Sequence, residues 1–295
     1  MLRHRILANV IGISVSLSGL LLLPDKGNAQ SFTTIDVPGA IRSQARYLNP
    51  RGDIVGFYTA ADGTMHGFLR SKDGELNTID APDNAPGGFT SALGINPQGD
   101  IVGSYGSAVK QHGFLLTNAG TFTTLDFPGA MNTSASAINA RGDIAGAYTA
   151  GGTTHGFIRD ADGNYTSFDV PGATFTAAND IDSKGQIVGG YGSGGTNHGF
   201  LRAPDGGFTY FDVPGAINPA VGTQTRGIND AGDIVGWFVI SSGARRGFIL
   251  SHGEFTFIDF PGALGTDTDG INSPGDVVGG YDGTDHKHHA YVRTK

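Results

Sequence analysis

The chain has 295 residues and a net charge of −8 at pH 7, with 49 glycines and no cysteine. Such an acidic chain lacks the basic footprint of a nucleic-acid-binding protein, and an anionic membrane surface is a poor partner for it. The absence of cysteine excludes disulfides, so packing has to stabilise the fold.

The first element along the chain is a predicted export signal over residues 1–29. Arg3 and Arg5 supply positive charge, residues 6–23 are largely apolar, and small residues follow. These features are typical of a signal peptide that is cleaved after Ala29. A retained membrane anchor is the alternative, because the apolar stretch is near the lower limit for a span. We therefore expect a secreted or periplasmic protein with no membrane span after cleavage.

Residues 30–295 repeat one pattern six times, at intervals of about 45 residues, with no linker between copies. The pattern is centred on an Asn-x-x-Gly turn and a run such as Asp-Ile-Val-Gly. Repeats of this length with four short β segments are typical of propeller blades, whereas solenoid rungs are shorter or helical. The six copies of the turn and its strand are residues 49–56, 96–103, 139–146, 182–189, 229–236 and 272–279.

The second copy shows the four strands that we predict for each blade. The first ends at the turn, the second is residues 100–105, the third is residues 112–116 and the fourth is residues 122–127. Pro128 follows the fourth strand, and because proline cannot donate to a sheet ladder we expect this strand on the outer edge. A glycine within the second strand, Gly103 in this copy, is expected to mark a place where neighbouring blades crowd.

The two ends of the repeat region are halves of one unit. Residues 32–38 have the sequence of a fourth strand with no blade before them, and the sixth copy stops after its third strand. Pairing of the two would remove two free sheet edges. We therefore predict an all-β, six-bladed β-propeller with four-stranded blades, in which the N-terminal strand completes the C-terminal blade. The predicted blades are residues 41–82, 89–128, 132–171, 174–214, 222–261 and 265–295.

The repeated motifs resemble those of a known family. Gly-Ile-Asn, then Gly-Asp-Ile-Val-Gly, then His-Gly-Phe or His-Ala-Tyr is similar to the HAF-type extracellular repeats of bacteria, named for a His-Ala-Phe triplet. The similarity covers residues 32–294, although the middle residue is glycine in five copies and the fifth copy has Arg246 in place of histidine. The resemblance implies export and a propeller-like repeat fold. It implies no activity and no catalytic residue.

Three kinds of polar residue recur in the blades and together supply the ingredients of a hydrolytic triad. An active site needs one nucleophile and one base, so a sixfold recurrence indicates a structural need of every blade. We expect a hydrogen-bonded network that satisfies buried polar groups, and we predict no catalytic residue. The residues are His66, His112, His155, His198, Arg246 and His289; Asp36, Asp80, Asp126, Asp169, Asp212 and Asp259; and Ser43, Thr90, Thr133, Thr176, Thr223 and Thr266.

Function is expected where the repeat symmetry breaks. Connections from each fourth strand to the next first strand, and from each second to third strand, should emerge on one face, and they vary in length and content. Extra residues occur at 83–88 and 217–222. Variable loops on a rigid scaffold are where binding usually resides, so we expect the ligand on this variable-loop face.

Six residues are the candidate ligand contacts. The only tryptophan, Trp237, can stack on a sugar ring, lie against a guanidinium, or merely fill space between blades. Arg46 and Arg226 belong to first strands, where ordinary solvated positions would vary in the same way. Arg245 lies in the loop that follows Trp237, and Asp267 and Asp269 belong to a polar cluster of the sixth blade that could hold a divalent cation or a polar ligand. The six candidates are Arg46, Arg226, Trp237, Arg245, Asp267 and Asp269.

The sixth blade also holds candidate metal ligands, namely Asp282, Asp285, His286 and His288. Carboxylates suit calcium, and imidazoles suit zinc or other transition metals. Their spacing matches no established metal loop, and a solvated polar loop is the alternative. We therefore expect that the protein has no cofactor. If this cluster binds an ion, a divalent cation is the ion that it would hold.

The first functional hypothesis is an exported, monomeric, non-catalytic propeller that binds a polar ligand, either a polysaccharide or a cell-surface protein. Shallow pockets repeated between blades favour multivalent recognition of polymers. The second is a hydrolase or lyase that acts on an extracellular polymer with a site in the sixth blade. The third is a structural surface or matrix protein. Fold alone does not choose between them, because propellers host all three.

Overall fold

The computed structural model describes residues 31–82, 87–107, 109–216 and 221–295. The predicted export signal at residues 1–29 lies outside the described residues. Most of the two connections with extra residues, 83–88 and 217–222, lies outside them as well. The described residues form 24 β-strands and no helix, which confirms the all-β prediction. Accordingly, this part of the chain contains no helix long and apolar enough to cross a membrane.

The strands form groups of four, which we number by their place along the chain. The first group is β2 (Arg42–Leu48), β3 (Ile54–Thr59), β4 (Met65–Arg70) and β5 (Leu76–Ile79). The second is β6 (Phe89–Ile95), β7 (Ile101–Gly106), β8 (Gln111–Leu116) and β9 (Phe122–Leu125). The third is β10 (Asn132–Ile138), β11 (Ile144–Ala150), β12 (Thr153–Arg159) and β13 (Tyr165–Phe168).

The remaining groups follow the same order, except that the last takes a strand from the other end of the chain. The fourth is β14 (Phe175–Ile181), β15 (Ile187–Ser193), β16 (Thr196–Arg202) and β17 (Phe208–Phe211). The fifth is β18 (Thr223–Ile228), β19 (Ile234–Val239), β20 (Arg245–Ser251) and β21 (Glu254–Ile258). The sixth is β22 (Gly265–Ile271), β23 (Val277–Asp282), β24 (His288–Thr294) and β1 (Ser31–Thr34).

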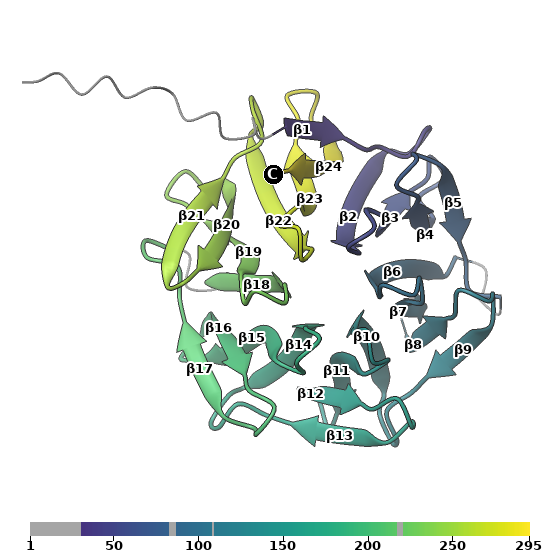
Figure 1. Ribbon diagram of the computed structural model, residues 1–295, viewed down its shortest axis with the longest axis vertical. Coiled ribbons are helices and arrows are strands. Elements are labelled where there is room, and N and C mark those ends of the chain that lie inside the picture. The colour runs from purple at the N-terminus through teal and green to yellow at the C-terminus, as the bar shows by residue number, and fades with distance from the viewer. Residues whose placement is uncertain (1–30, 83–86, 108, 217–220) are drawn as a thin grey trace, which may run out of the picture.

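The groups surround a common axis, with the first strands β2, β6, β10, β14, β18 and β22 nearest to it and the fourth strands outside (Figure 1). The third, fourth and fifth groups are separate antiparallel sheets. Single parallel bridges, Arg42–His288 and Met65–Phe89, link the sixth, first and second groups. This arrangement places the outer edge at the fourth strands, as the prolines predict.

The turn between the first and second strands forms as its sequence predicts. In the first group the Asn49 side-chain oxygen accepts hydrogen bonds from the N–H groups of Arg51 and Asp53, both at 3.0 Å. Gly52 has a φ of 91°, a left-handed conformation that favours glycine. The Asn-x-x-Gly pattern therefore specifies a tight hairpin with a side-chain cap.

The glycine within each second strand is crowded, but not by a neighbouring group. A Cβ on Gly103 would lie 2.0 Å from the Ser91 carbonyl oxygen and 2.6 Å from the Phe114 ring. Both residues belong to the same group as Gly103, so the expected contact between blades is wrong. The glycine instead makes room for the third-strand aromatic of its own sheet, and Phe114 is fully buried there.

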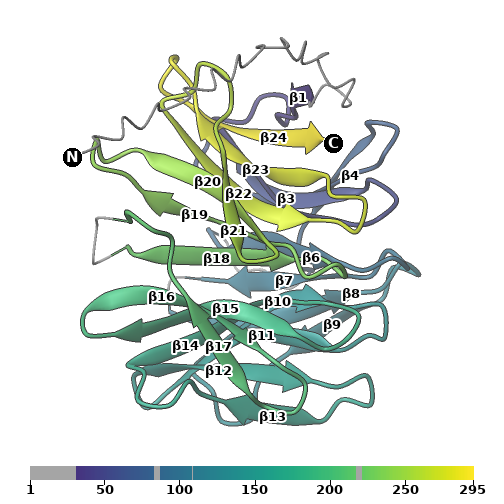
Figure 2. The same cartoon turned by 60° about the vertical axis from the view of Figure 1, so that its left-hand side comes forward.

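β1 pairs with β24 in antiparallel register, from Ser31 opposite Thr294 to Thr34 opposite Tyr291, and Figure 2 shows the two strands side by side. β1 is shorter than the predicted 32–38, because the ladder ends at Thr34. Beyond the ladder, the Asp36 carboxylate contacts the His289 Nδ1 at 2.6 Å and accepts a hydrogen bond from the Ala290 N–H at 3.2 Å. Residues from the two ends of the chain thus complete the sixth group.

Replacement of Phe32 by alanine should weaken this pairing. The Phe32 ring packs edge-on against Phe260, with ring centroids 5.4 Å apart, and also against Tyr291 at 5.7 Å. Loss of a partly buried ring should lower the free energy of unfolding by about 1–3 kcal/mol. Urea unfolding measures this loss, with the exposed neighbour Thr33→Ala as the control. Equal stability of the two variants would contradict the packing role of β1.

Replacement of His289 by glutamine should change how stability depends on pH. Partial burial acts to lower the pKa of His289, but hydrogen bonds and charges from Asp36 and Asp285 outweigh it, and the net pKa is raised. A raised pKa stabilises the fold below the ordinary histidine pKa of about 6.5, and this contribution disappears as the pH rises through the folded-state pKa. Urea unfolding of wild type and His289→Gln should differ most at acidic pH, and a pH-independent difference would argue against the ion pairs.

Candidate functional site

The repeated polar residues do not form a hydrolytic triad. Each hydroxyl accepts a hydrogen bond from a backbone N–H just after the fourth strand, as Thr176 does from Val170 at 3.0 Å. Each histidine pairs instead with the aspartate of its group, as His112 does with Asp126 at 2.9 Å. These aspartate side chains are 37% to 55% exposed, so the expected buried network is correct for the hydroxyls and wrong for the charged pairs.

The symmetry breaks at one end of the axis, where a cavity of about 180 Å³ lies between the sixth, fifth and first groups. We call it the axial cavity. All six candidate ligand contacts line it, so the structure brings them together from five strands of three groups. Arg42, Gln44 and Phe57 complete the lining. The full set is Arg42, Gln44, Arg46, Phe57, Arg226, Trp237, Arg245, Asp267 and Asp269.

Asp267 is only 2% exposed, and its carboxylate is held by donors on several sides. It accepts hydrogen bonds from the Gln44 side-chain amide at 3.1 Å and the Gly280 N–H at 2.7 Å, and it forms an ion pair with Arg245. Since a buried charge is tolerated only when paired and hydrogen-bonded, these contacts account for its presence at the axis.

Asp269 is also buried, and two arginines approach the same one of its oxygens. Arg46 Nη1 lies 2.8 Å from Oδ1, while Arg226 Nε lies 3.7 Å from it, beyond hydrogen-bond range. Burial raises the pKa of Asp269 although Arg46 acts to lower it. Burial, and then the charge of Arg46, lower the pKa of Arg226 to about 10. One carboxylate therefore serves two guanidinium groups.

Trp237 forms part of the cavity wall beside two of these arginines. The guanidinium carbon of Arg226 lies 5.9 Å from the Trp237 ring centroid, and that of Arg245 lies 5.8 Å from it. Both distances fall in the range of cation–π contacts. Of the three roles considered from the sequence, contact with a guanidinium is the one that the structure displays.

The four predicted metal ligands are not brought together as one set. His288 Nδ1 contacts Asp282 at 2.9 Å, and Arg245 contacts both residues. Asp285 lies in the turn before β24, where His286 adopts a positive φ of 63°, and it contacts His289 of β24 instead. In the described ranges, no group of three or more Cys, His, Asp or Glu side chains is placed to hold a metal ion.

Gly280 is the residue that allows the charged cluster to form. A Cβ at this position would lie 2.2 Å from His288 Nε2 and 2.9 Å from Asp267 Oδ1. Trp237 and Phe57 occupy the same place in the fifth and first groups. Gly280 was not among the residues predicted for a site, although its lack of a side chain at the repeat position of Phe57 and Trp237 is a sequence signal that could have identified it.

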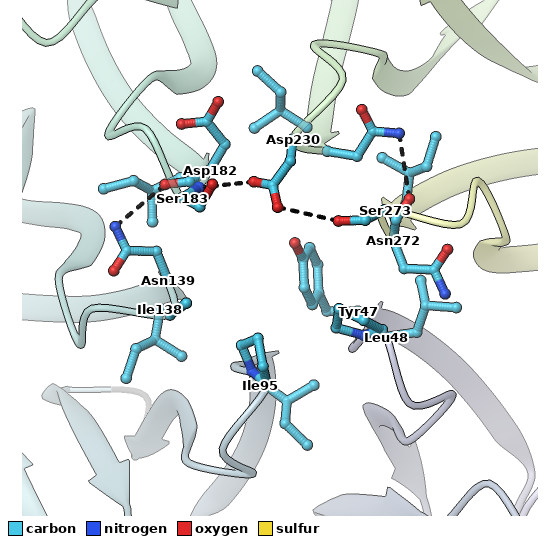
Figure 3. A pocket seen from close by; sticks show the side chains of 17 residues that line it. Tyr47, Leu48, Ile95, Ile138, Asn139, Asp182, Ser183, Asp230, Asn272 and Ser273 are labelled. Atoms are coloured by element: carbon cyan, nitrogen blue, oxygen red, sulfur yellow. Dashed lines mark hydrogen bonds between the residues drawn. The ribbon is translucent and has the colours of Figure 1, made fainter.

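The opposite end of the axis is narrower and differently lined. The cavity there has a volume of about 50 Å³, and Figure 3 shows aliphatic side chains around it, with Tyr47 pointing toward Asp230. Asp230 accepts hydrogen bonds from the Ser183 N–H and the Ser273 hydroxyl, at 3.0 and 3.2 Å. Nearby, burial raises the pKa of Asp180 to about 7. The larger, arginine-rich end is therefore the better candidate for a ligand site.

No known protein family matches the sequence, and no curated protein matches it either. Solved structures with a similar fold include virginiamycin B lyase from Staphylococcus aureus, at 14% identity and a TM-score of 0.53 over 88% of each chain. AofleA from Arthrobotrys oligospora matches at 13% and 0.58, over 89% of this chain and 85% of its own. The fucose-specific lectin from Aleuria aurantia matches at 10% and 0.54, over 88% and 93%. These are β-propeller proteins, and at such identities only the propeller-like fold is shared.

Replacement of Gly280 by alanine should disrupt the charged cluster, because the new methyl group would displace His288 and Asp267. The expected cost is about 1–3 kcal/mol of unfolding free energy. The matched control is Gly190→Ala at the same repeat position of the fourth group, where the nearest atom to a Cβ lies 3.8 Å away. The control should be neutral or stabilising by up to about 1 kcal/mol. Urea unfolding compares them, and equal effects would refute the crowding at residue 280.

Proposed function

We propose that this chain is an exported six-bladed propeller that binds a polar ligand in the axial cavity without catalysis. The observation that carries this proposal is the uneven distribution of charge around the axis. Arg42, Arg46, Arg226, Asp267 and Asp269 come from the first strands of three adjacent groups. The equivalent positions of the second, third and fourth groups are Phe89, Ser91, Leu93, Asn132, Ser134, Ser136, Phe175, Ala177 and Asn179. Residues with a purely structural role would recur in all six groups, whereas the residues of a binding site need to occur only where that one site is formed.

Contacts between the sixth and first groups support a closed ring of six blades. The Asn272 side-chain amide donates to the Asn49 carbonyl at 3.4 Å, just as Asn139 donates to the Asp182 carbonyl at 3.2 Å between the third and fourth groups. The ion pair between Arg46 and Asp269 joins the sixth and first groups at the other end of the axis. The last and first groups therefore meet in the same way as consecutive groups do.

The repeated His-Gly-Phe runs support membership of the HAF-type extracellular repeats, and residues 1–29 support export. Export would place the axial cavity in contact with extracellular or periplasmic ligands. We propose a polysaccharide as the first candidate and a cell-surface protein as the second. One of the structural neighbours described above favours the first, because it is named as a fucose-specific lectin.

The environment of His288 favours binding over catalysis. Its Nδ1 contacts Asp282 and Arg245, and its Nε2 contacts the Gln44 side chain. A general base needs a ring nitrogen that can reach the proton of the substrate. Both nitrogens of His288 are already engaged by the protein, so the histidine is better placed to hold the cluster than to transfer a proton.

A glycan array tests the proposal. The purified protein should bind a subset of polysaccharide fragments and release no product from them. Trp237→Ala, which removes the surface under two arginines, should weaken binding at least tenfold. Tyr210→Ala is the matched control, since Tyr210 is 48% exposed on β17, outside the axial cavity. Product release would support the lyase or hydrolase alternative, and binding that is equally strong in both variants would place the ligand elsewhere.

A further inference from the structure

We infer that the part of the ligand that enters the axial cavity is an anionic group, a carboxylate, sulfate ester or phosphate, held by Arg46 and Arg226. This inference rests on the proposed function and adds to it the chemical class of the group that is bound. Its basis is the charge, the hydrogen-bonding capacity and the shape of the cavity.

The cavity is cationic within an acidic protein. Its lining contains four arginines and two aspartates, while the whole chain has a net charge of −8. Arg245 is engaged by two carboxylates, Asp267 and Asp282. Asp269 is then the only carboxylate in the lining left for Arg46 and Arg226, so one positive charge of this pair is not balanced by the lining. An anion placed between the two guanidinium groups would balance it.

The same two arginines have hydrogen-bond donors to spare. The Nε atoms of Arg46 and Arg226 are buried, and neither has a hydrogen-bond partner within the part of the chain that the structure describes. Their side chains are still 22% and 24% exposed, so each guanidinium can be reached from the cavity. A guanidinium presents five N–H donors in a rigid plane that matches the oxygens of carboxylate and phosphate. A neutral sugar hydroxyl would leave the surplus charge uncompensated.

The buried aspartates do not favour a cation at this site. Gln44 donates to both carboxylates, and the Gly280 N–H donates to Asp267. Donors therefore occupy oxygens that a cation would need. The volume of about 180 Å³ accommodates a carboxylate- or sulfate-sized group together with several water molecules. We therefore expect a charged side group or terminus of a larger ligand to enter the cavity.

The single tryptophan makes the test specific to this site, because Trp237 lines the cavity. Tryptophan fluorescence of the purified protein is followed during titration with galacturonate, galactose 6-sulfate, galactose 6-phosphate and neutral galactose at constant ionic strength, and with acetate, sulfate and phosphate alone. At least one anion should give a saturable change, and galactose should not. Comparison of the three charged sugars identifies the anion. No saturable change with any anion, or an equal change with galactose, would overturn the inference.

Charge variants separate anion binding from a loss of folding. Arg226→Gln and Arg46→Gln should each weaken the anion response by about tenfold to a hundredfold. Arg51→Gln is the control, since Arg51 pairs with Asp53 on the hairpin turn and does not line the cavity. Asp269→Asn should strengthen the response several-fold, because it removes the competing carboxylate, and a misfolded protein would show no such gain. Weaker binding in Asp269→Asn, with an unchanged melting temperature, would favour a cation and contradict the inference.

The two proposals fail in different ways. If the array detects glycans whose binding depends on Trp237 but which are neutral and are not displaced by the anions, the inferred ligand class is wrong and the proposed function stands. If the anions titrate but no glycan or protein ligand depends on Trp237, the anion site stands and the proposed function is wrong.

Discussion

The rest of the arrangement depends on the hydrogen bonds of the asparagine that begins the hairpin between the first and second strands of a group. In the third group the Asn139 side-chain oxygen accepts two backbone N–H groups of its own turn, while its amide donates to the carbonyl of Asp182 in the next group. The same side chain therefore shapes a hairpin and joins it to its neighbour. Equivalent contacts run from Asn49 to Asn96, from Asn229 to Asn272 and from Asn272 to Asn49. They gather one end of the first strands tightly around the axis, which leaves the wider cavity at the other end.

Repetition and function make opposite demands on the first strands. Every group needs its turn, its hydroxyl and its buried third-strand aromatic, and these recur. Buried charges carry a desolvation cost that a stable scaffold would avoid, and the charges that line the axial cavity come from only three groups. Gly280 shows how local this departure is, because its missing side chain makes room for His288 and Asp267 where the first and fifth groups place a phenylalanine and a tryptophan. The groups that line the axial cavity therefore differ from the others in their side chains and not in the order of their strands.

Local features of the fold were predictable from the sequence. Turn residues such as Asn49 and Gly52 act within a few positions, so the all-β fold and the four-stranded pattern follow from them. The sequence also singled out six residues that the structure places together around the axial cavity, because each departs from the repeat. Their pairing was not predictable, since Arg46 and Asp269 are 223 positions apart and their contact depends on how distant groups meet. For the same reason the sequence suggested a metal site at Asp282 and Asp285, which the fold directs to different partners.

The sixth group consists of two pieces, and this has a consequence for folding. The Ser31 hydroxyl lies 2.7 Å from the Thr294 hydroxyl, so β24 ends where β1 begins, at the place where other groups have a hairpin turn. A short linker there, with the chain opened at another turn, would give a circular permutant whose sixth sheet is a single hairpin-connected unit. In the natural order this sheet has the highest sequence separation in the molecule, and contacts of that kind form slowly because loop closure is entropically costly. Joining of β1 to β24 is thus expected to be the final and rate-limiting event of folding.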